Sequence, residues 1–142
     1  MHREALEAAL AALGHDTTWQ SQLNAVGATW FGAGWRGCWA CDRLPAVGAD
    51  GVGVANTGRA PPAGARIGHW VAFMDSGNER CFSDPLGAVG RPQRADLAAL
   101  YPQAHWSDDD PEMAVSENIC GPASLAACAV GHSHGRDAFL RV

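Results

Sequence analysis

Apolar residues recur at helical spacing at the start of the chain. Leu6, Leu10 and Leu13 fall at positions i, i+4 and i+7, which places them on one face of a helix that Gly14 can end. A second, short helix is predicted to follow. The Gly- and Trp-rich stretch 27–37 is expected to form a loop or a short strand.

The middle of the chain alternates apolar and polar residues, as half-buried β-strands do. One strand is predicted around Val52 and Val54. The stretch 67–74 is the most strand-like in the sequence, 75–78 has the composition of a hairpin turn, and 79–84 is expected to return as the partner strand.

The last third of the chain predicts one more major element. Residues 120–130 read as a buried, Ala-rich helix ended by Gly131, after a shorter helix over 92–100. The whole pattern predicts an α+β fold, a small mixed or antiparallel sheet flanked by helices, with 1–142 as a single domain.

Composition narrows the class of protein. The net charge of −5 disfavours a surface that neutralises nucleic-acid phosphates. Scattered solubilising charges explain the arginines of two loop-like stretches better than a basic patch does; these are Arg59, Arg66, Arg91 and Arg94. No apolar run is long enough to span a membrane, and the start of the chain does not read as a signal peptide. Five cysteines, an odd number at irregular spacing, suit a reducing compartment rather than secretion.

Cys120 is the best candidate nucleophile. It stands at the predicted start of the last long helix, directly before Gly121. A thiolate there faces unpaired backbone N–H groups and the positive end of the helix dipole, which favour the charged form. The glycine removes side-chain bulk and lets a substrate backbone approach the sulfur.

A nucleophilic cysteine needs a base, and the base needs an acceptor that orients it. His69 lies on the strongest predicted strand. A turn centred on Ser76 and Gly77 would place Asp84 directly opposite His69, with Cα atoms about 4.5–5.5 Å apart. This register predicts a hydrogen bond between the imidazole and the Asp84 carboxylate.

Two alternatives weaken that assignment. Asp75 is a competing carboxylate, although six strand residues would separate it from His69 by roughly 20 Å. A three-residue hairpin loop would pair Asp84 with Trp70 and turn His69 to the other face. Each candidate also has a structural interpretation, since a lone strand histidine or a cysteine opening an apolar helix is usually part of the core. Their occurrence together, hairpin first and helix second, favours catalysis.

Three motifs in this order carry a resemblance to a known family: Gly68-His69-Trp70-Val71-Ala72-Phe73, Cys81-Phe82-Ser83-Asp84-Pro85-Leu86-Gly87 and Cys120-Gly121. The sequence resembles the adenovirus protease, adenain, and more distantly the ubiquitin-like-protein proteases. The adenovirus enzymes have a similar His-Trp strand, an acidic residue before Pro-aromatic-Gly, and a Cys-Gly pair opening the central helix. Papain-type enzymes place the cysteine first.

The resemblance implies an adenain-like cysteine protease with its nucleophile at the N-terminus of a central helix and with no cofactor. Cys120 would attack the scissile carbonyl, His69 would act as base and then acid, and Asp84 would orient His69. Trp70 and Gly121 would support the site. The implied enzyme is a viral maturation endopeptidase that cuts capsid and core precursors beside small residues, often glycine, in the virion and the cell interior. An activating peptide or nucleic acid is a further implied partner.

The sequence departs from the family pattern beside the nucleophile. Family members carry an oxyanion-hole glutamine six or seven residues before the cysteine, where this chain has Ala114 and Met113. Loss of such a donor costs on the order of 10²–10³ in rate. Asn118 or Ser116 could take its place beside the backbone N–H of Cys120. No cysteine lies between the hairpin and Cys120, so a disulfide-tethered activating peptide is not expected.

Other functions stay open. One alternative is a deubiquitinase- or deSUMOylase-like isopeptidase, and another is a catalytically weakened virion or binding protein that keeps the fold. The Cys38-Trp39-Ala40-Cys41 motif admits a redox or zinc site, but zinc needs two further ligands, which would have to come from Cys81, His132 or His134. Two packed thiols are the simpler interpretation.

Overall fold

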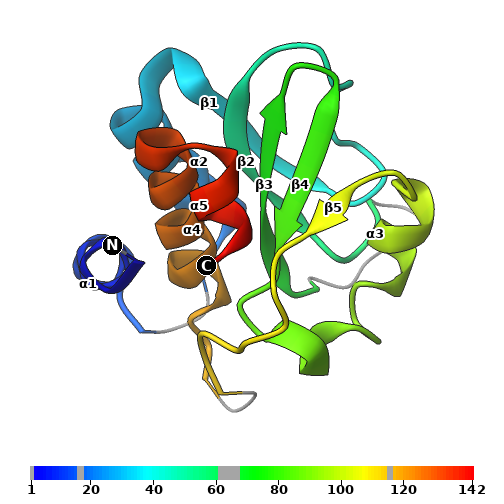
Figure 1. The fold of residues 1–142 in the computed structure, drawn as a ribbon. Helices are drawn as coiled ribbons and strands as arrows, with labels where there is room; N and C mark the ends of the chain where they lie inside the picture. The colour runs from blue at the N-terminus through cyan, green and yellow to red at the C-terminus, as the bar shows by residue number, and fades with distance from the viewer. Residues whose placement is uncertain (1, 16–17, 61–67, 115–116) are drawn as a thin grey trace.

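The computed structural model describes residues 2–15, 18–60, 68–114 and 117–142. Over these residues the chain has a five-stranded mixed sheet and five α-helices (Figure 1), which confirms the predicted α+β class. Along the chain the elements are α1 (His2–Leu13), α2 (Gln20–Phe31), the 3-10 turn η1 (Gly32–Gly34), β1 (Trp35–Ala40), β2 (Gly51–Asn56), β3 (Trp70–Ser76), β4 (Glu79–Ser83), the 3-10 turn η2 (Gly87–Gly90), α3 (Ala95–Leu100), β5 (His105–Trp106), α4 (Cys120–His134) and α5 (Arg136–Leu140).

The sheet has its strands in chain order, β1-β2-β3-β4-β5. The central strands β2, β3 and β4 run antiparallel, while the edge strands β1 and β5 pair in parallel with their neighbours. The helix α4 packs on β2 and β3, and α1 lies against α4 on the side away from the sheet (Figure 1). Within the described residues no helix is long and apolar enough to cross a membrane.

Apolar residues fill both faces of the sheet. Between the sheet and the helices lies a cluster that includes Val54, Ala72 and Leu125. The other face carries a cluster of alternate strand residues and α3, including Phe73 and Leu97. The alternation of buried residues along β3 therefore sends successive side chains into different clusters, as the pleat of a strand requires.

Two helices continue through glycines that were expected to lie at or beyond their C-terminal ends. The helix α2 includes Gly27, because a Cβ there would lie 2.4 Å from the Trp35 ring and the bare glycine lets the indole pack on the helix. The helix α4 includes Gly131, where a Cβ would lie 2.9 Å from the Met74 sulfur. It ends at Gly135, whose φ of 90° is favoured by glycine.

The shorter elements also differ from expectation. The helix α3 begins at Ala95, because residues 91–94 form turns rather than the first turn of a helix at Pro92. The short edge strand β5 lies between the third and fourth helices, where the sequence analysis names no element.

The β3–β4 hairpin has a different register from the predicted one. Ser76 pairs with Glu79, so the turn consists of Gly77, with φ 63°, and Asn78. The predicted turn lay one residue earlier, and the predicted pairing is therefore wrong by two residues. Because two is even, every side chain of the hairpin keeps its expected face.

Candidate active site

Three elements meet at one end of the sheet. There β3 begins, β4 ends and α4 begins (Figure 1). His69 directly precedes β3, Asp84 directly follows β4, and Cys120 is the first residue of α4. The structure thus brings together the three side chains that the sequence singles out.

The His69 side chain is hydrogen-bonded to Asp84, and the His69 backbone is hydrogen-bonded to Thr57. Its Nε2 lies 2.6 Å from Oδ1 of Asp84, and both residues are buried. The His69 N–H donates to the Thr57 hydroxyl at 2.9 Å, and the His69 carbonyl accepts from the Thr57 N–H at 2.8 Å. These two backbone bonds fix the imidazole at the start of β3.

The surroundings of His69 favour its protonated form. Burial opposes the charge, but hydrogen bonds to Asp84 and Cys120, and the negative charges these groups carry when ionised, outweigh burial and raise the pKa of His69 from 6.5 to about 9. Because Asp84 occupies Nε2, the ring nitrogen left for Cys120 is Nδ1. His69 therefore carries a proton at neutral pH and can present it toward the sulfur.

Asp84 is an anchored carboxylate. Burial opposes the charge of Asp84, but three neighbours stabilise it and keep the pKa of Asp84 below its ordinary value. The first is His69, through its hydrogen bond and its charge. The others are the Leu86 N–H, 2.9 Å from Oδ1, and the Arg94 guanidinium, 2.9 Å from Oδ2. Gly90 borders the same carboxylate: a Cβ there would lie 2.1 Å from Oδ2. The loop after β4 is thus shaped around this side chain.

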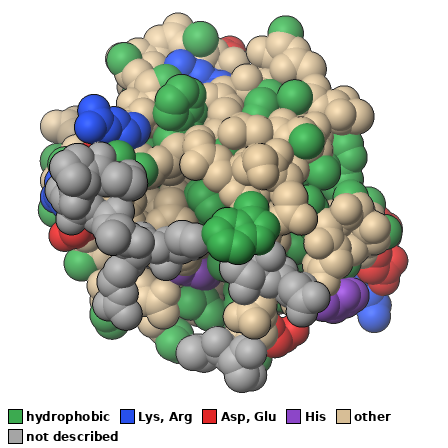
Figure 2. Space-filling view, turned by 180° about the vertical axis from the view of Figure 1, so that it is seen from behind, with side chains coloured by type: hydrophobic (Ala, Val, Ile, Leu, Met, Phe, Trp, Pro, Cys, Tyr) green, Lys and Arg blue, Asp and Glu red, His purple; other side chains and the backbone are tan. Residues whose placement is uncertain are grey.

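Arg94 is a contact of the site that the sequence did not reveal. It was grouped with surface arginines, but the structure buries it on Asp84, with only 7% of the residue exposed. It lies in a turn before α3, where neither helical nor strand periodicity marks a buried position. Among the described residues, the basic side chains on the rear face in Figure 2 are isolated from one another.

Cys120 is half-buried and opens α4. No side chain of the described residues caps this helix, and Pro122 at its third position has no N–H. The N–H groups of Cys120 and Gly121 are the donors that remain at the helix start. Among the described residues neither N–H has a hydrogen-bond partner.

The supporting residues Trp70 and Gly121 meet at Thr18. The Trp70 indole N–H donates to the Thr18 carbonyl at 3.2 Å. A Cβ on Gly121 would lie 2.8 Å from the Thr18 side chain, so only glycine lets the two segments approach this closely. Thr18 therefore ties the start of α2 to both elements that carry His69 and Cys120.

The residues near the expected glutamine offer no equivalent side chain. Met113 is buried with other apolar residues, and the Ala114 N–H donates to the Glu117 carboxylate. Asn118 is exposed and no hydrogen bond of its amide is found among the described residues, while Ser116 lies outside them.

The competing carboxylate Asp75 lies at the far end of β3. It is fully buried and pairs with Arg36 and with Arg80, whose Nε lies 2.7 Å away. Asp75 also stands opposite Arg80 in the hairpin rather than opposite the predicted Asn78. Its charge is thus satisfied by arginines, away from His69.

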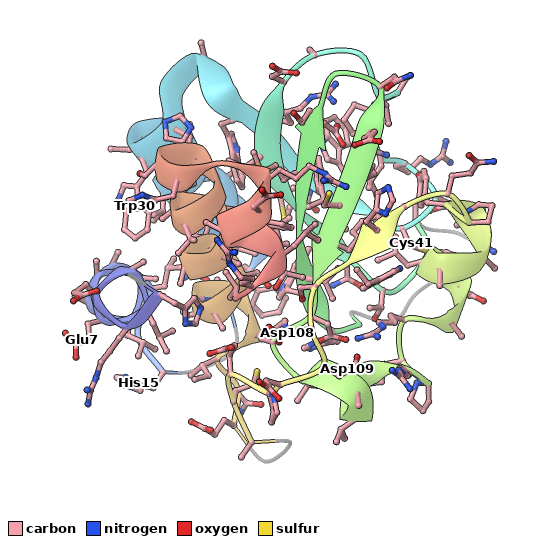
Figure 3. The ribbon with its side chains drawn as sticks, in the orientation of Figure 1. Glu7, His15, Trp30, Cys41, Asp108 and Asp109 are labelled. Atoms are coloured by element: carbon pink, nitrogen blue, oxygen red, sulfur yellow. The ribbon has the colours of Figure 1, made fainter. Side chains whose placement is uncertain are left out.

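The Cys38 and Cys41 thiols do not form a shared site. Cys38 belongs to the core cluster beneath α4, whereas Cys41 lies on the other face of the sheet (Figure 3). Burial raises the pKa of Cys38 to about 12, which disfavours a reactive thiolate. No group of three metal-binding side chains occurs among the described residues.

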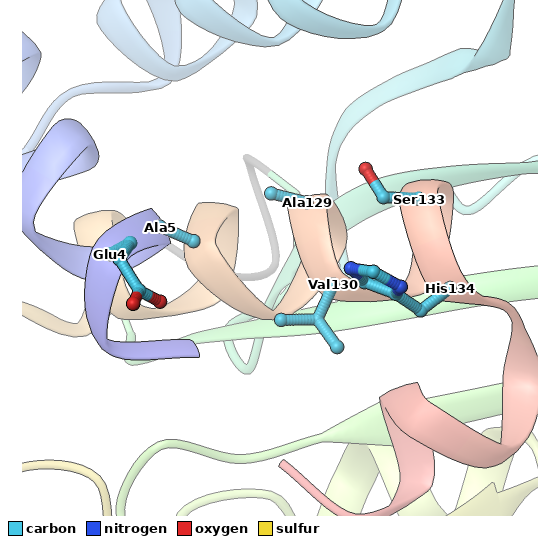
Figure 4. Close-up of a pocket in the computed structure, with 6 residues that line it drawn as sticks. All are labelled: Glu4, Ala5, Ala129, Val130, Ser133 and His134. Atoms are coloured by element: carbon cyan, nitrogen blue, oxygen red, sulfur yellow. The ribbon is translucent and has the colours of Figure 1, made fainter. Parts of the chain in front are cut away.

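The two histidines considered as zinc ligands lie in the last turns of α4. His132 packs edge-on against Phe31, with ring centroids 5.2 Å apart. His134 borders a pocket of about 430 Å³ between α1 and α4, shown in Figure 4 with Glu4 and Ser133. This pocket lies along the later turns of α4, away from Cys120.

A thiol beside a protonated imidazole that a carboxylate holds can exist as a thiolate–imidazolium pair, which attacks electrophilic carbonyl carbons. This is the chemistry for which the described geometry is suited. Comparison with models of known protein families and with curated proteins gave no significant match.

Proposed function

We propose that the chain is a cysteine endopeptidase with an adenain-like fold. The observation that carries the proposal is the 2.6 Å hydrogen bond between His69 and Asp84. Cys120, at the start of α4, is hydrogen-bonded to the same imidazole and also raises the pKa of His69. The order His, Asp, Cys along the chain and the position of the cysteine at a helix N-terminus support the resemblance to the adenovirus enzymes.

The reaction would proceed through a thioester. The Cys120 thiolate attacks the scissile carbonyl carbon, and as the C–N bond breaks the leaving nitrogen takes the proton of His69. A water molecule then attacks the thioester carbon and gives a proton to His69, and a second tetrahedral intermediate releases the Cys120 thiolate. The net reaction consumes one water and yields a carboxylic acid and an amine.

The oxyanion of each tetrahedral intermediate would be held by backbone donors. The N–H groups of Cys120 and Gly121 stand at the start of α4, where no described side chain caps the helix, and they would supply these donors without a side chain. Without a glutamine at 113 or 114, one side-chain donor is missing, and we expect turnover slower by roughly 10²–10³ than with such a donor.

The substrate class rests on the resemblance. It points to polypeptides cut beside small residues such as glycine, among them capsid and core precursors. Gly121 agrees with a close approach of the substrate backbone to the sulfur, because it adds no side chain beside Cys120.

The proposal is tested by incubating the purified chain with a library of peptides derived from a proteome. Mass spectrometry then identifies the new termini that cleavage creates. We expect cleavage beside small residues by the unaltered chain and none by Cys120→Ala or His69→Ala. Cleavage that persists in Cys120→Ala would refute the proposal, as would an unaltered chain that neither cleaves peptides nor reacts with a peptidyl vinyl sulfone. Reaction of Cys120 with a ubiquitin- or SUMO-derived probe, but with no short peptide, would favour the isopeptidase.

A further inference from the structure

The Asp84 carboxylate divides its two oxygens between two cationic side chains. Oδ1 takes the His69 imidazole at 2.6 Å and the Leu86 N–H at 2.9 Å. Oδ2 takes Nη1 of Arg94 at 2.9 Å, and the same nitrogen donates to the Gly87 carbonyl at 3.0 Å. Arg94 therefore holds the carboxylate and the backbone of the loop after β4 together.

Arg94 is itself immobilised. Its guanidinium lies over the Trp106 ring, 4.3 Å from the centroid. Its Nη2 lies 3.8 Å from Oδ1 of Asp109, a residue on the segment after β5 that also pairs with the exposed Arg91 (Figure 3). A planar guanidinium fixed by stacking and by a second carboxylate loses little further freedom on binding Asp84.

The charges around Asp84 form an alternating series. From the surface inward they are Arg91, Asp109, Arg94, Asp84 and the His69 imidazolium, with the Cys120 sulfur beyond it. Asp84 and His69 are buried, so their charges interact through a medium that screens less than water does. A single carboxylate facing two cations attracts each less strongly than it would attract one alone.

We propose that Arg94 is a positioning residue of the protease, acting through Asp84: it draws the charge of the carboxylate toward Oδ2 and so shares that charge with the imidazolium, while the Leu86 N–H keeps Oδ1 beside His69. Loss of Arg94 would leave the full charge of Asp84 on His69. The imidazolium would then release its proton less readily to the leaving nitrogen, and Asp84 would be protonated more easily at low pH.

The inference rests on the proposed function for its kinetic consequence, but its electrostatic part can be measured without a substrate. NMR titration of the His69 imidazole in the full chain compares the unaltered protein with Arg94→Met, Asp84→Asn and Arg91→Met. We expect the His69 midpoint to rise by about 1 pH unit in Arg94→Met and to fall in Asp84→Asn. Arg91 is the matched control: it contacts Asp109 but not Asp84, and its exposed charge is screened by solvent, so its variant should titrate like the unaltered chain.

The opposite signs separate sharing of the Asp84 charge from simple loss of structure. If Arg94 only supported the fold of the loop, its removal would free Asp84 from His69, and the His69 midpoint would fall as in Asp84→Asn. A falling or unchanged midpoint in Arg94→Met would overturn the inference. If Arg94→Met does not fold, Arg94→Lys replaces it. Because the charge is kept, its midpoint should stay near that of the unaltered chain, and a fall to the Asp84→Asn value would refute the inference.

A kinetic measurement distinguishes this inference from the proposed function. On a cleaved peptide, Arg94→Met should lower kcat by about tenfold with a smaller change in KM, because a proton transfer and not substrate binding is affected. A chain that cleaves no peptide but shows the expected titrations would refute the protease and leave the Arg94–Asp84–His69 coupling in place. An active protease in which Arg94→Met changes neither the His69 midpoint nor kcat would support the protease and refute the coupling.

Discussion

Nε2 of His69 lies 2.6 Å from Oδ1 of Asp84, although the two residues are not partners across the hairpin. The last pair of the β3–β4 ladder is Ala72 with Ser83, so His69 and Asp84 both lie beyond it. Each is held there by contacts outside the ladder, His69 by Thr57 and Asp84 by Arg94. The bond therefore depends on the loops at the end of the sheet and not on strand pairing.

Replacing Asp84 by asparagine removes the charge that holds the His69 proton while keeping the shape of the side chain. Because burial would then dominate, the pKa of His69 should fall from about 9 to below its ordinary value. We expect the alkaline limb of kcat/KM to move to lower pH and kcat to fall by about 10²–10⁴, less than in His69→Ala. An alkaline limb that stays at the pH of the unaltered enzyme would count against Asp84 as the partner of His69.

The sequence predicts where the three site residues lie better than it predicts the contacts between them. His69, Asp84 and Cys120 could be placed because each adjoins a periodic element whose type is readable. Asp84 was chosen through a register that is wrong by two residues, and the two side chains meet through contacts beyond the end of the ladder instead of through the predicted strand pair. The catalytic role of the three residues remains a prediction.

The parts that could not be predicted depend on tertiary contacts. Gly27 and Gly131 read as helix breakers, but each permits a close approach of another side chain, Trp35 or Met74, that only the folded chain reveals. Arg94 reads as a surface charge because its partner Asp84 lies ten residues away across an irregular loop. Local pattern carries no information on such pairs.

Gly90→Ala tests whether the loop after β4 is shaped around Asp84. A methyl group would lie 2.1 Å from Oδ2, so the carboxylate or the loop must move. We expect a loss of about 1–3 kcal/mol in the free energy of unfolding, and kcat lower by about tenfold or more. The neighbouring Val89→Ala is the control, because Val89 is 58% exposed and its truncation should change neither quantity noticeably. Equal behaviour of the two variants would contradict this account.

Cys120→Ala should affect turnover and not stability, whereas Cys128→Ala should affect stability and not turnover. Cys120 is half-buried at a helix end, so its loss should abolish turnover with little change in Tm. Cys128 is fully buried and its thiol donates to the Gly53 carbonyl, so its loss should cost about 1–2 kcal/mol of stability and leave turnover intact. Thermal unfolding and peptide cleavage measure the two effects. Residual turnover in the Cys120→Ala variant would show that Cys120 is not the nucleophile.

The Cys38 and Cys41 thiols should resist oxidation to a disulfide. They lie in core clusters on opposite faces of the sheet, and burial raises the pKa of both. After mild diamide treatment of the folded chain, peptide mapping should find both as free thiols, with modification confined to Cys120. Stoichiometric zinc in the purified protein, or a disulfide between Cys38 and Cys41, would restore the redox or metal interpretation.

The stability of the fold should decrease as the pH rises through the neutral range. The pKa of His69 is raised, so the folded state binds its proton more tightly than the unfolded state does. The resulting stabilisation is complete below about pH 6.5 and is lost as the pH rises through about 9, at about 1 kcal/mol per pH unit. The pKa of Asp84 is lowered, so its contribution is present at neutral pH and is lost only as acid protonates the folded carboxylate.

Between about pH 6.5 and 8.5 the slope should belong to His69, because the buried thiols with raised pKa begin to contribute only where unfolded cysteines ionise, near pH 8.5. Urea unfolding at several pH values in this window measures the slope. The matched variant is His69→Ala, in which the dependence on pH should largely disappear. If the unaltered chain and His69→Ala lose stability in parallel, the folded chain does not hold a proton on His69, and the thiolate–imidazolium pair loses its support.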